Sequence, residues 1–507
     1  MKSLPVYSTA LLLLVLCSGG SSSIGGRAQM FPFHYDNVLG TSCDLKILAT
    51  SEARAEQAQT AALDEIDRQA KILSGYDPSS EFSRWFRTSG QAVRVSPELF
   101  EVLGLFDQWR DRTNGALDAS AETVTRVWKN AAVENRMPSM NELAAAVAAV
   151  RQRHWELDPA ARTATHLDNA PLVLNSFAKS YIIDHAAQAA MKTADVTGVV
   201  VNIGGDLAVR GAFTEPVDIA DPFSGADNAE PIDSLMIHDR AVATSGNYRR
   251  GVEIGGRHYS HIVDPRTGLT AEDIVSSTVV APVPADAGAL ATAFSVMEPA
   301  ESARLAATMP GVEYLLVTKS GERIASPGWM AMVVARPVAR PRVSFLPAAA
   351  AGDSWDPAME LTISVDIARP DGRAKRPYLA VWIEDADHFP VRTIALWMEK
   401  AKYLNEMKAW YKGDRLRAMA EGKEITRSVS SATRSPGKYT LNWDGKDNAG
   451  KPVKPGKYTV LIEATREHGT DQTLRQEMDF TGTPKQVALP GGIEIAGATL
   501  DYHKLTR

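Results

Sequence analysis

Residues 198–206 read Gly198-Val199-Val200-Val201-Asn202-Ile203-Gly204-Gly205-Asp206, and this stretch decides the class of fold. A short, continuous run of β-branched residues is typical of a strand that is buried on both faces. The paired glycines predict that the strand ends in a tight turn, and the aspartate follows that turn directly. We therefore expect a central strand with a carboxylate at its end.

The segments around this strand mix two periodicities. Apolar residues recur at three- and four-residue steps between Ala55 and Leu73, which predicts an amphipathic helix. Further helices are expected over Phe177–Met191 and Ala285–Met297, and a further strand over Ser276–Val283. The elements do not follow a strict βαβ repeat, so the prediction is an α+β fold.

A break in composition separates this part of the chain from the rest. Residues 334–353 hold three prolines and an alanine run, which predicts a linker with little regular structure. We expect a large domain at 30–333, a smaller one at 354–485 and a C-terminal tail at 486–507.

The smaller domain has the pattern of an antiparallel β-sandwich. Strand-like segments at Leu361–Ile367, Tyr378–Ile383 and Tyr458–Glu463 are accompanied by the turn dipeptides Asp444-Gly445 and Pro455-Gly456.

The overall composition excludes one class of function. The 507 residues carry 55 Lys+Arg and 61 Asp+Glu, a formal net charge of −6. Such a balance gives no electrostatic reason to expect a nucleic acid as partner.

The first 28 residues have the pattern of a secretory signal peptide. Lys2 precedes an apolar run at residues 10–16, which is too short to span a bilayer, and Gly26-Arg27-Ala28 offers a cleavage site. The alternative is a lipoprotein signal in which Cys17 is acylated, and only then is membrane anchoring expected. The chain is predicted to be exported, to the periplasm, with Cys43 as its remaining thiol.

Common catalytic motifs are absent from the sequence. It contains no GxGxxG after a strand, no GxxxxGK[ST], no GxSxG and no HExxH. These absences argue against Rossmann dehydrogenases, P-loop kinases, serine esterases and zinc proteases.

Five polar clusters stand at the ends of the predicted elements instead. They are Ala178–Tyr181 with Asp184, Asn202–Asp206, Ala243–Tyr248, Tyr259–Gly268 and Ala289–Thr292. Taken singly, each has a plain structural interpretation: Gly204-Gly205 as a tight turn, His261 as a core histidine and Asp264–Gly268 as a simple turn.

In this order the clusters resemble the FAD:protein FMN transferases, the ApbE family, over about residues 36–330. Leu39-Gly40-Thr41, Ser74–Glu81 and Gly115–Asp118 extend the resemblance. It implies a transferase that moves FMN from FAD to a threonine hydroxyl of a flavin acceptor protein of an exported redox system, with release of AMP. It also implies Mg²⁺ as cofactor and FAD as substrate.

The resemblance also suggests roles for individual residues. His261 and Asp264 are the catalytic candidates, because they are the titratable groups best placed to take the threonine proton. The candidate flavin-binding residues are Tyr181, Asn202, Gly204, Gly205, Asp206, Thr244, Ser245, Gly246 and Tyr248.

The implied magnesium ligands are the Ala178 carbonyl, the Thr292 side chain and an aspartate. The family pattern A-D-x-L-A-T has its aspartate four residues before the threonine, where this chain has Gly288. The nearest carboxylate, Asp286, is the candidate replacement, although a two-residue offset on a helix rotates a side chain by about 200°. The family's LDLGGxAKGY is changed as well, and Ser180 stands where that pattern has its last glycine.

The smaller domain resembles a family of predicted periplasmic domains of unknown function. Within it, residues 430–433 resemble the acceptor motif S/T-G-A-T, which makes Thr433 a possible FMN acceptor with an exposed hydroxyl; Thr499 is a looser match. Two alternatives to the transferase stay open: a non-catalytic flavin-binding protein of the same fold, and an electron-transfer flavoprotein that carries covalent FMN on this domain.

Overall fold

The computed structural model describes residues 28–505, apart from 225, 227, 248–249, 335–353, 370–375, 399–400, 423–424, 432 and 467–468. The predicted signal peptide, except Ala28, and the predicted linker, except Val334, therefore lie outside the described residues. No helix in the described part of the chain is long and apolar enough to cross a membrane.

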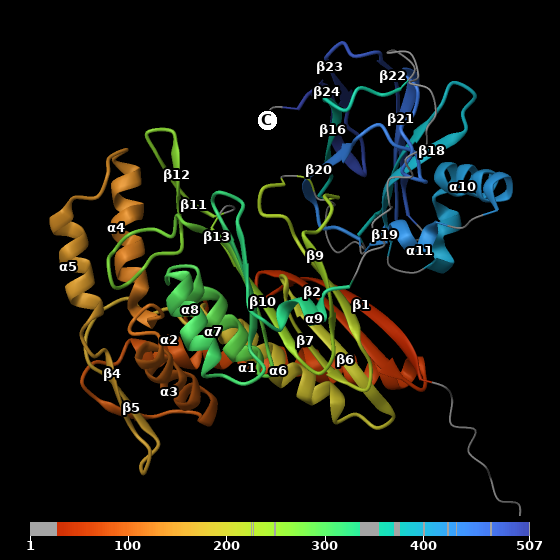
Figure 1. The fold of residues 1–507 in the computed structure, drawn as a ribbon. Helices are drawn as coiled ribbons and strands as arrows, with labels where there is room; N and C mark the ends of the chain where they lie inside the picture. The colour runs from red at the N-terminus through yellow and green to blue at the C-terminus, as the bar shows by residue number, and fades with distance from the viewer. Residues whose placement is uncertain are drawn as a thin grey trace, which may run out of the picture.

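An eight-stranded sheet forms the centre of the first domain (Figure 1). Every neighbouring pair in it is antiparallel. The order across the sheet is β1 (Gln29–Val38), β2 (Thr41–Ala49), β6 (Val196–Ile203), β7 (Asp206–Gly211), β10 (Ala241–Gly246), β13 (Ile274–Ala281), β14 (Glu313–Thr318) and β15 (Arg323–Ala325).

Strand β6 explains why the stretch at 198–206 is so apolar. Val199 and Val201 belong to the hydrophobic core on one face of the sheet, while Val200 belongs to the core on the other face. Successive side chains of a strand point to opposite faces, so a strand covered on both sides needs apolar residues throughout. The predicted buried strand is confirmed.

Helices cover one face of the sheet, and they are close to those predicted. They are α1 (Glu52–Leu73), α6 (Ala178–Met191) and α7 (Pro284–Phe294). The opposite face is covered by a hairpin of β8 (Glu215–Ile219) and β9 (Asp233–Ile237) with the short helix α9 (Trp329–Met332).

The remaining elements of this domain lie around one end of the helical layer (Figure 1). They are α2 (Glu81–Phe86), β3 (Ala92–Arg94), α3 (Pro97–Arg112), η1 (Ala119–Ala121), α4 (Glu122–Val133), α5 (Met140–Val150), β4 (Trp155–Asp158), β5 (Thr163–His166), β11 (Gly251–Ile254), β12 (Arg257–Ser260) and α8 (Pro299–Ala307).

The second domain packs two sheets face to face, as predicted for a sandwich. One sheet has the order β20, β16, β24, β23 and the other the order β19, β18, β17, β21, β22. Their bounds are β16 (Met359–Ile367), β17 (Tyr378–Glu384), β18 (Pro390–Trp397), β19 (Ser430–Ser431), β20 (Gly437–Trp443), β21 (Gly456–Thr465), β22 (Asp471–Phe480), β23 (Lys485–Pro490) and β24 (Ile495–Lys504). All pairs are antiparallel except β18 with β19.

Helical segments of the second domain were not expected from its sequence. They are η2 (Ala401–Glu406), α10 (Lys408–Glu421) and α11 (Thr426–Val429). Trp410 and Met407 pack against Trp382 and Tyr378 on the outer face of the five-stranded sheet. The sheet therefore has apolar side chains on both faces, which hid this layer from a search for alternation.

The prediction that residues 486–507 form a tail is wrong. Strand β24 lies between β16 and β23, and Leu500 is fully buried in the sandwich core. Alternation of apolar and polar residues along β24 is the signal that would have revealed it.

Among the described residues, Asn228 and Asn442 join the two domains by a pair of hydrogen bonds. The side chain of Asn228 donates to the Asn442 carbonyl and accepts from the Asn442 amide, each at 2.8 Å. Asn228 stands between β8 and β9, and Asn442 on β20, so a side-chain amide pairs with the backbone of a sheet edge.

Candidate active site

A polar cluster lies where α6 begins beside the ends of the central strands. Its centre is Asp206, the first residue of β7. The Lys179 ammonium lies 2.9 Å from Asp206 Oδ2, and the Ser180 hydroxyl donates to the same oxygen at 3.4 Å. The Thr244 amide donates to Asp206 Oδ1, also at 3.4 Å. The carboxylate thus joins a helix to two strands.

The turn between β6 and β7 places Asp206. Gly204 and Gly205 both have positive φ, +58° and +93°, which glycine adopts without strain. The Asn202 side chain accepts from the Gly205 amide at 3.1 Å and so closes the turn. A Cβ on Gly204 would lie 2.7 Å from Thr41, whereas one on Gly205 would meet nothing within 4 Å.

Helix α7 contributes Thr292 to the same cluster. Its hydroxyl donates to the Ser176 carbonyl at 3.3 Å and lies 3.5 Å from the Ser245 hydroxyl. The neighbouring Thr244 hydroxyl lies 3.0 Å from that of Thr278 on β13. The structure therefore brings together the predicted residues around Asp206, Thr244, Ser245 and Thr292, which come from three distant parts of the sequence.

Gly288 has its open side toward α6. A Cβ at this position would lie 2.5 Å from Ser180 Oγ and 3.3 Å from the Phe177 Cα. Ser180 is 2% exposed, so its side chain cannot simply swing into solvent. A carboxylate at position 288 is therefore incompatible with the present packing.

Asp286 stands in the first turn of α7 and differs from position 288 in direction. It precedes Gly288 by two residues on α7, so the two positions point about 200° apart around the helix. Burial raises the pKa of Asp286, and the one charged group opposing that shift is Arg112, at the end of α3. The expectation that Asp286 compensates for Gly288 is not supported by this geometry.

The residues present fit a divalent cation poorly. Mg²⁺ prefers oxygen ligands that include carboxylates. Ala178 and Thr292 offer only neutral oxygens, and Asp206 is engaged by Lys179. No three or more His, Cys, Asp or Glu side chains gather as a possible metal site within the described residues.

His261 follows the β11–β12 hairpin. Its Nδ1 lies 3.0 Å from the Arg250 carbonyl, and a carbonyl can only accept, so Nδ1 carries the proton and Nε2 has a free lone pair. The residue reaches the surface, yet partial desolvation of its ring lowers its pKa. The hydrogen bond to Arg250 opposes this shift, and nearby positive charges add to it. A neutral imidazole with a free Nε2 is a competent proton acceptor.

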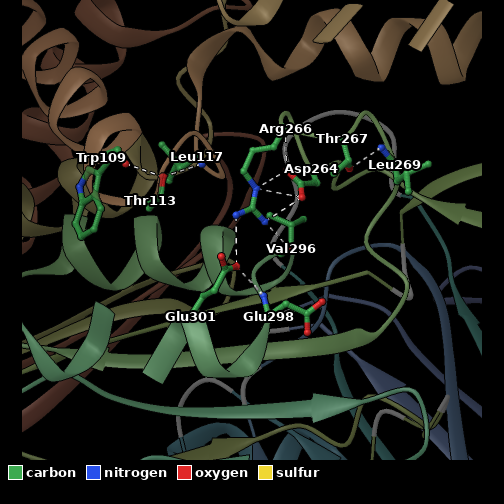
Figure 2. Close-up of polar contacts among 10 residues, drawn as sticks. All are labelled: Trp109, Thr113, Leu117, Asp264, Arg266, Thr267, Leu269, Val296, Glu298 and Glu301. Atoms are coloured by element: carbon green, nitrogen blue, oxygen red, sulfur yellow. Dashed lines mark hydrogen bonds and ion pairs between the residues drawn. The ribbon is translucent and has the colours of Figure 1, made fainter. Parts of the chain in front are cut away.

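Asp264 is bound to Arg266 rather than to His261 (Figure 2). The Arg266 Nε donates to Asp264 Oδ1 at 2.9 Å, and a terminal nitrogen donates to Oδ2 at 3.0 Å. Arg266 also donates to the Val296 carbonyl at 3.1 Å and reaches Glu301 of α8 at 3.4 Å. Both carboxylate oxygens accept hydrogen bonds from Arg266, so Asp264 positions Arg266, and its role as a proton acceptor stays a prediction.

A cavity of about 470 Å³ opens beside Arg266. Its lining includes Arg110 and Arg151 as well as Gly115 and Asp118 of the predicted motif. Asp118 is itself held by Arg110, at 3.1 Å. The cavity thus carries three guanidinium groups and the carboxylates of Asp111 and Asp118, and Arg266 is paired with Asp264, which leaves Arg151 as the guanidinium with most charge available to a ligand.

The two tyrosines among the predicted flavin-binding residues are Tyr181 and Tyr248. Tyr181 is buried in the core, and its hydroxyl donates to Glu101 at 2.8 Å. Burial, followed by this hydrogen bond, raises its pKa. Tyr181 is therefore a core residue of α6, and the prediction that it contacts the flavin ring is not supported. Tyr248 lies outside the described residues, and Gly246 is the last residue of β10.

Thr433 is 2% exposed, so the prediction of an exposed hydroxyl is wrong. Its carbonyl accepts from Arg376 at 2.9 Å, and the next residue, Arg434, lies over the Trp397 ring. Polar residues beside a proline and a glycine suggested a loop, but two arginines fasten this segment to the sheet.

Sequence reasoning gave no role to Lys179 and Arg266, although each stands inside a motif cluster. Lys179 forms an ion pair with Asp206, and Arg266 forms one with Asp264. The pair of Asp264 and Arg266 could have been expected from the sequence, because the two residues stand two positions apart. Lys179 and Asp206 are far apart in the sequence, and only the fold brings them together.

Comparison with known proteins identifies the family of the first domain and that of the second. The ApbE family model matches residues 39–316, just over half of the chain, and the model of a predicted periplasmic protein (DUF2271) matches residues 360–496. The FAD:protein FMN transferase of Treponema pallidum is 28% identical over 354 residues, covering 65% of this chain and 96% of the relative. That of Klebsiella pneumoniae is 25% identical over 305 residues, covering 58% and 85%.

Solved structures agree with the fold. An ApbE protein from Thermotoga maritima is 26% identical, with a TM-score of 0.53, and the match covers 60% of this chain and 99% of that one. The flavin transferase ApbE from Vibrio cholerae, at 22% identity and a TM-score of 0.50, shares the fold over 60% of this chain and 99% of that one. Through residues 39–316, the chain belongs to the ApbE family.

Proposed function

We propose that this chain is an exported FAD:protein FMN transferase. The observation that carries the proposal is the family match over residues 39–316, supported by relatives that are themselves named FAD:protein FMN transferase. The match of the second domain to a predicted periplasmic protein supports the exported location.

Two basic regions favour a ligand with phosphates. Lys179 stands in the first turn of α6, whose N-terminus has no side-chain cap. The end of a helix dipole and a lysine both favour a phosphate there. The cavity beside Arg266 contains the guanidinium of Arg151, besides those of Arg110 and Arg266 that are paired with Asp118 and Asp264, and it could take the rest of a dinucleotide.

The proposed reaction is a phosphoryl transfer. A threonine Oγ of the acceptor protein attacks the phosphorus of the FMN half of FAD and forms a phosphoester. The bond from that phosphorus to the bridging oxygen breaks, and AMP leaves with that oxygen. The threonine proton passes to His261 Nε2, which is free to accept it.

Among the features that the family resemblance implies, a bound Mg²⁺ has the least support from the residues present. The Ala178 carbonyl and the Thr292 hydroxyl remain from the implied ligand set, while the carboxylate at position 288 is absent. No step of the proposed reaction is assigned to a metal for this reason.

Retention of FAD without transfer is the second candidate function. The packing of Ser180 against Gly288 favours it, because this packing removes an acidic ligand without disturbing the flavin-side residues around Asp206. The third reading, covalent FMN at Thr433, remains a prediction that must account for the burial of that residue.

The test is incubation of the purified chain with FAD, with and without Mg²⁺. Released AMP and flavin that stays with denatured protein report transfer. Retained but releasable FAD, without AMP, favours the second function. Absence of any FAD binding contradicts both.

A further inference from the structure

We infer that Ser180 and Gly288 form a matched pair that keeps a carboxylate out of this site, and that the chain binds FAD without a divalent cation. The inference rests on the proposed function only in its FAD-binding part. The steric part concerns the two helices alone.

The first step is the contact between α6 and α7. A Cβ at position 288 would lie 2.5 Å from Ser180 Oγ and 3.1 Å from Ser180 Cβ. Distances below 3 Å between such atoms require one of the groups to move, and in a packed interior this movement is costly. The Phe177 backbone, 3.3 Å from the same point, limits the escape of any side chain. Serine at position 180 therefore requires glycine at position 288.

The second step concerns the glycine at position 288, which stands inside helix α7. Glycine costs about 1 kcal/mol in a helix interior relative to alanine. Gly288 has no positive φ that would demand glycine, so its value lies in the space it leaves. Ser180 fills that space, and its hydroxyl donates to Asp206 at 3.4 Å.

The third step is the charge of the cluster. Asp206 is the carboxylate that Ser180 contacts, and it already accepts from Lys179, Ser180 and Thr244. A second, unpaired carboxylate would be needed to hold Mg²⁺ firmly. The positive charge available to a phosphate is instead the Lys179 ammonium, which requires no bound ion.

The experiment measures FAD affinity by quenching of flavin fluorescence, in EDTA and in millimolar Mg²⁺. The variants are Gly288→Asp, Ser180→Gly, the double variant Ser180→Gly/Gly288→Asp and its uncharged control Ser180→Gly/Gly288→Asn. Thermal unfolding and Mg²⁺ calorimetry are recorded for each protein.

For the wild type we expect FAD affinities within about twofold of each other in the two buffers, and no heat of Mg²⁺ binding. Gly288→Asp should lower the Tm of the first domain by about 5 °C or more, because it forces the clash. Ser180→Gly/Gly288→Asp should recover most of that loss. It should also bind FAD at least about tenfold more tightly with Mg²⁺ than with EDTA, while the asparagine control shows no response.

Three results would overturn the inference: Mg²⁺-dependent FAD binding by the wild type, a Gly288→Asp variant as stable as the wild type, or a double variant that fails to recover. Failure of every protein to bind FAD would instead overturn the proposed function. In that case the melting temperatures and Mg²⁺ heats still decide the inference.

Discussion

Lys179 Nζ lies 2.9 Å from Asp206 Oδ2, and this ion pair fastens the first turn of α6 to the first residue of β7. The lysine side chain is 31% exposed and the aspartate 14%, so the lysine is the more accessible partner of the pair. Asp206 thereby fixes the direction of the lysine, and the lysine keeps free donors for an anion.

We expect Lys179→Gln to weaken FAD binding by about ten- to a hundredfold, because one charge-assisted hydrogen bond to a phosphate is lost. Titration of flavin fluorescence measures the change. Lys192→Gln, at the other end of α6, is the matched control and should bind FAD like the wild type. Equal losses in the two variants would contradict a specific role for Lys179.

His261 should control the acidic limb of the rate profile. Partial desolvation lowers its pKa below the ordinary 6.5, so the ring stays neutral and able to accept a proton until the pH falls beneath that value. The rate of AMP release from FAD, measured from pH 8 down to pH 5, should fall with a midpoint below pH 6.5. His261→Gln should reduce the rate by about a hundredfold or more and remove this limb. An unchanged limb in that variant would assign it to another group.

Arg266→Met should destabilise the first domain by about 2–4 kcal/mol, because it leaves the buried Asp264 carboxylate without its partner. Arg266→Met/Asp264→Asn should recover part of the loss. Urea unfolding measures both variants. Arg257→Met, which breaks an exposed pair with Glu272, is the control and should change stability by less than about 0.5 kcal/mol. Similar losses at both positions would show that Arg266 acts only as a surface charge.

Cys43 should be inert in the folded chain. Burial, and then the charge of Asp44, raises the pKa of its thiol to about 12. At pH 8.5 its thiolate population is then about a thousandfold below that of an exposed cysteine. Alkylation of a Cys17→Ser variant should be slow in buffer and fast in urea. Because the unfolded thiol loses its proton first, the stability that this group contributes is kept below about pH 8 and declines above it. Fast labelling in buffer would contradict the burial of β2.

We expect FMN to be attached to Thr433 only while the segment around it is unfolded. The folded chain buries this residue, so incubation of folded protein with an active transferase and FAD should add no mass. Co-expression, in which the transferase meets the chain before it folds, is the condition that could yield an adduct of one FMN minus water. Intact-mass analysis with Thr433→Ala and Thr499→Ala identifies the residue. An adduct on folded protein at Thr433 would contradict the structure around β19.

The sequence was informative where a local pattern determines the structure. The apolar run at 198–203 predicted a doubly covered strand, and the glycine pair after it predicted the turn that holds Asp206. Ordered motifs identified the family, and the structure gathers several of them around one carboxylate. These features depend on periodicity and backbone conformation, which are local properties.

What failed depended on contacts between distant segments. The loss of a carboxylate at Gly288 was visible, but its match to Ser180 appears only when α6 packs on α7. The pairing of Asp264 with Arg266 was within reach of the sequence, but the contacts of Arg266 with Val296 and Glu301 appear only in the fold. The polar neighbours of Thr433 suggested exposure, whereas the fold brings Arg376 to its carbonyl and Arg434 onto the Trp397 ring.

The position of β24 determines when the second domain can form. Strand β16 uses β24 as one of its two neighbours, and β23 pairs with β24 alone. The four-stranded sheet therefore cannot close before residues 495–504 have been synthesised, although β16 is made about 130 residues earlier. The sheet of the first domain includes no strand beyond β15, so this domain can fold before the second domain has been synthesised. During synthesis, the sandwich is thus the last part of the described chain to become resistant to proteases, and a nonsense codon anywhere before residue 495 leaves it unfinished.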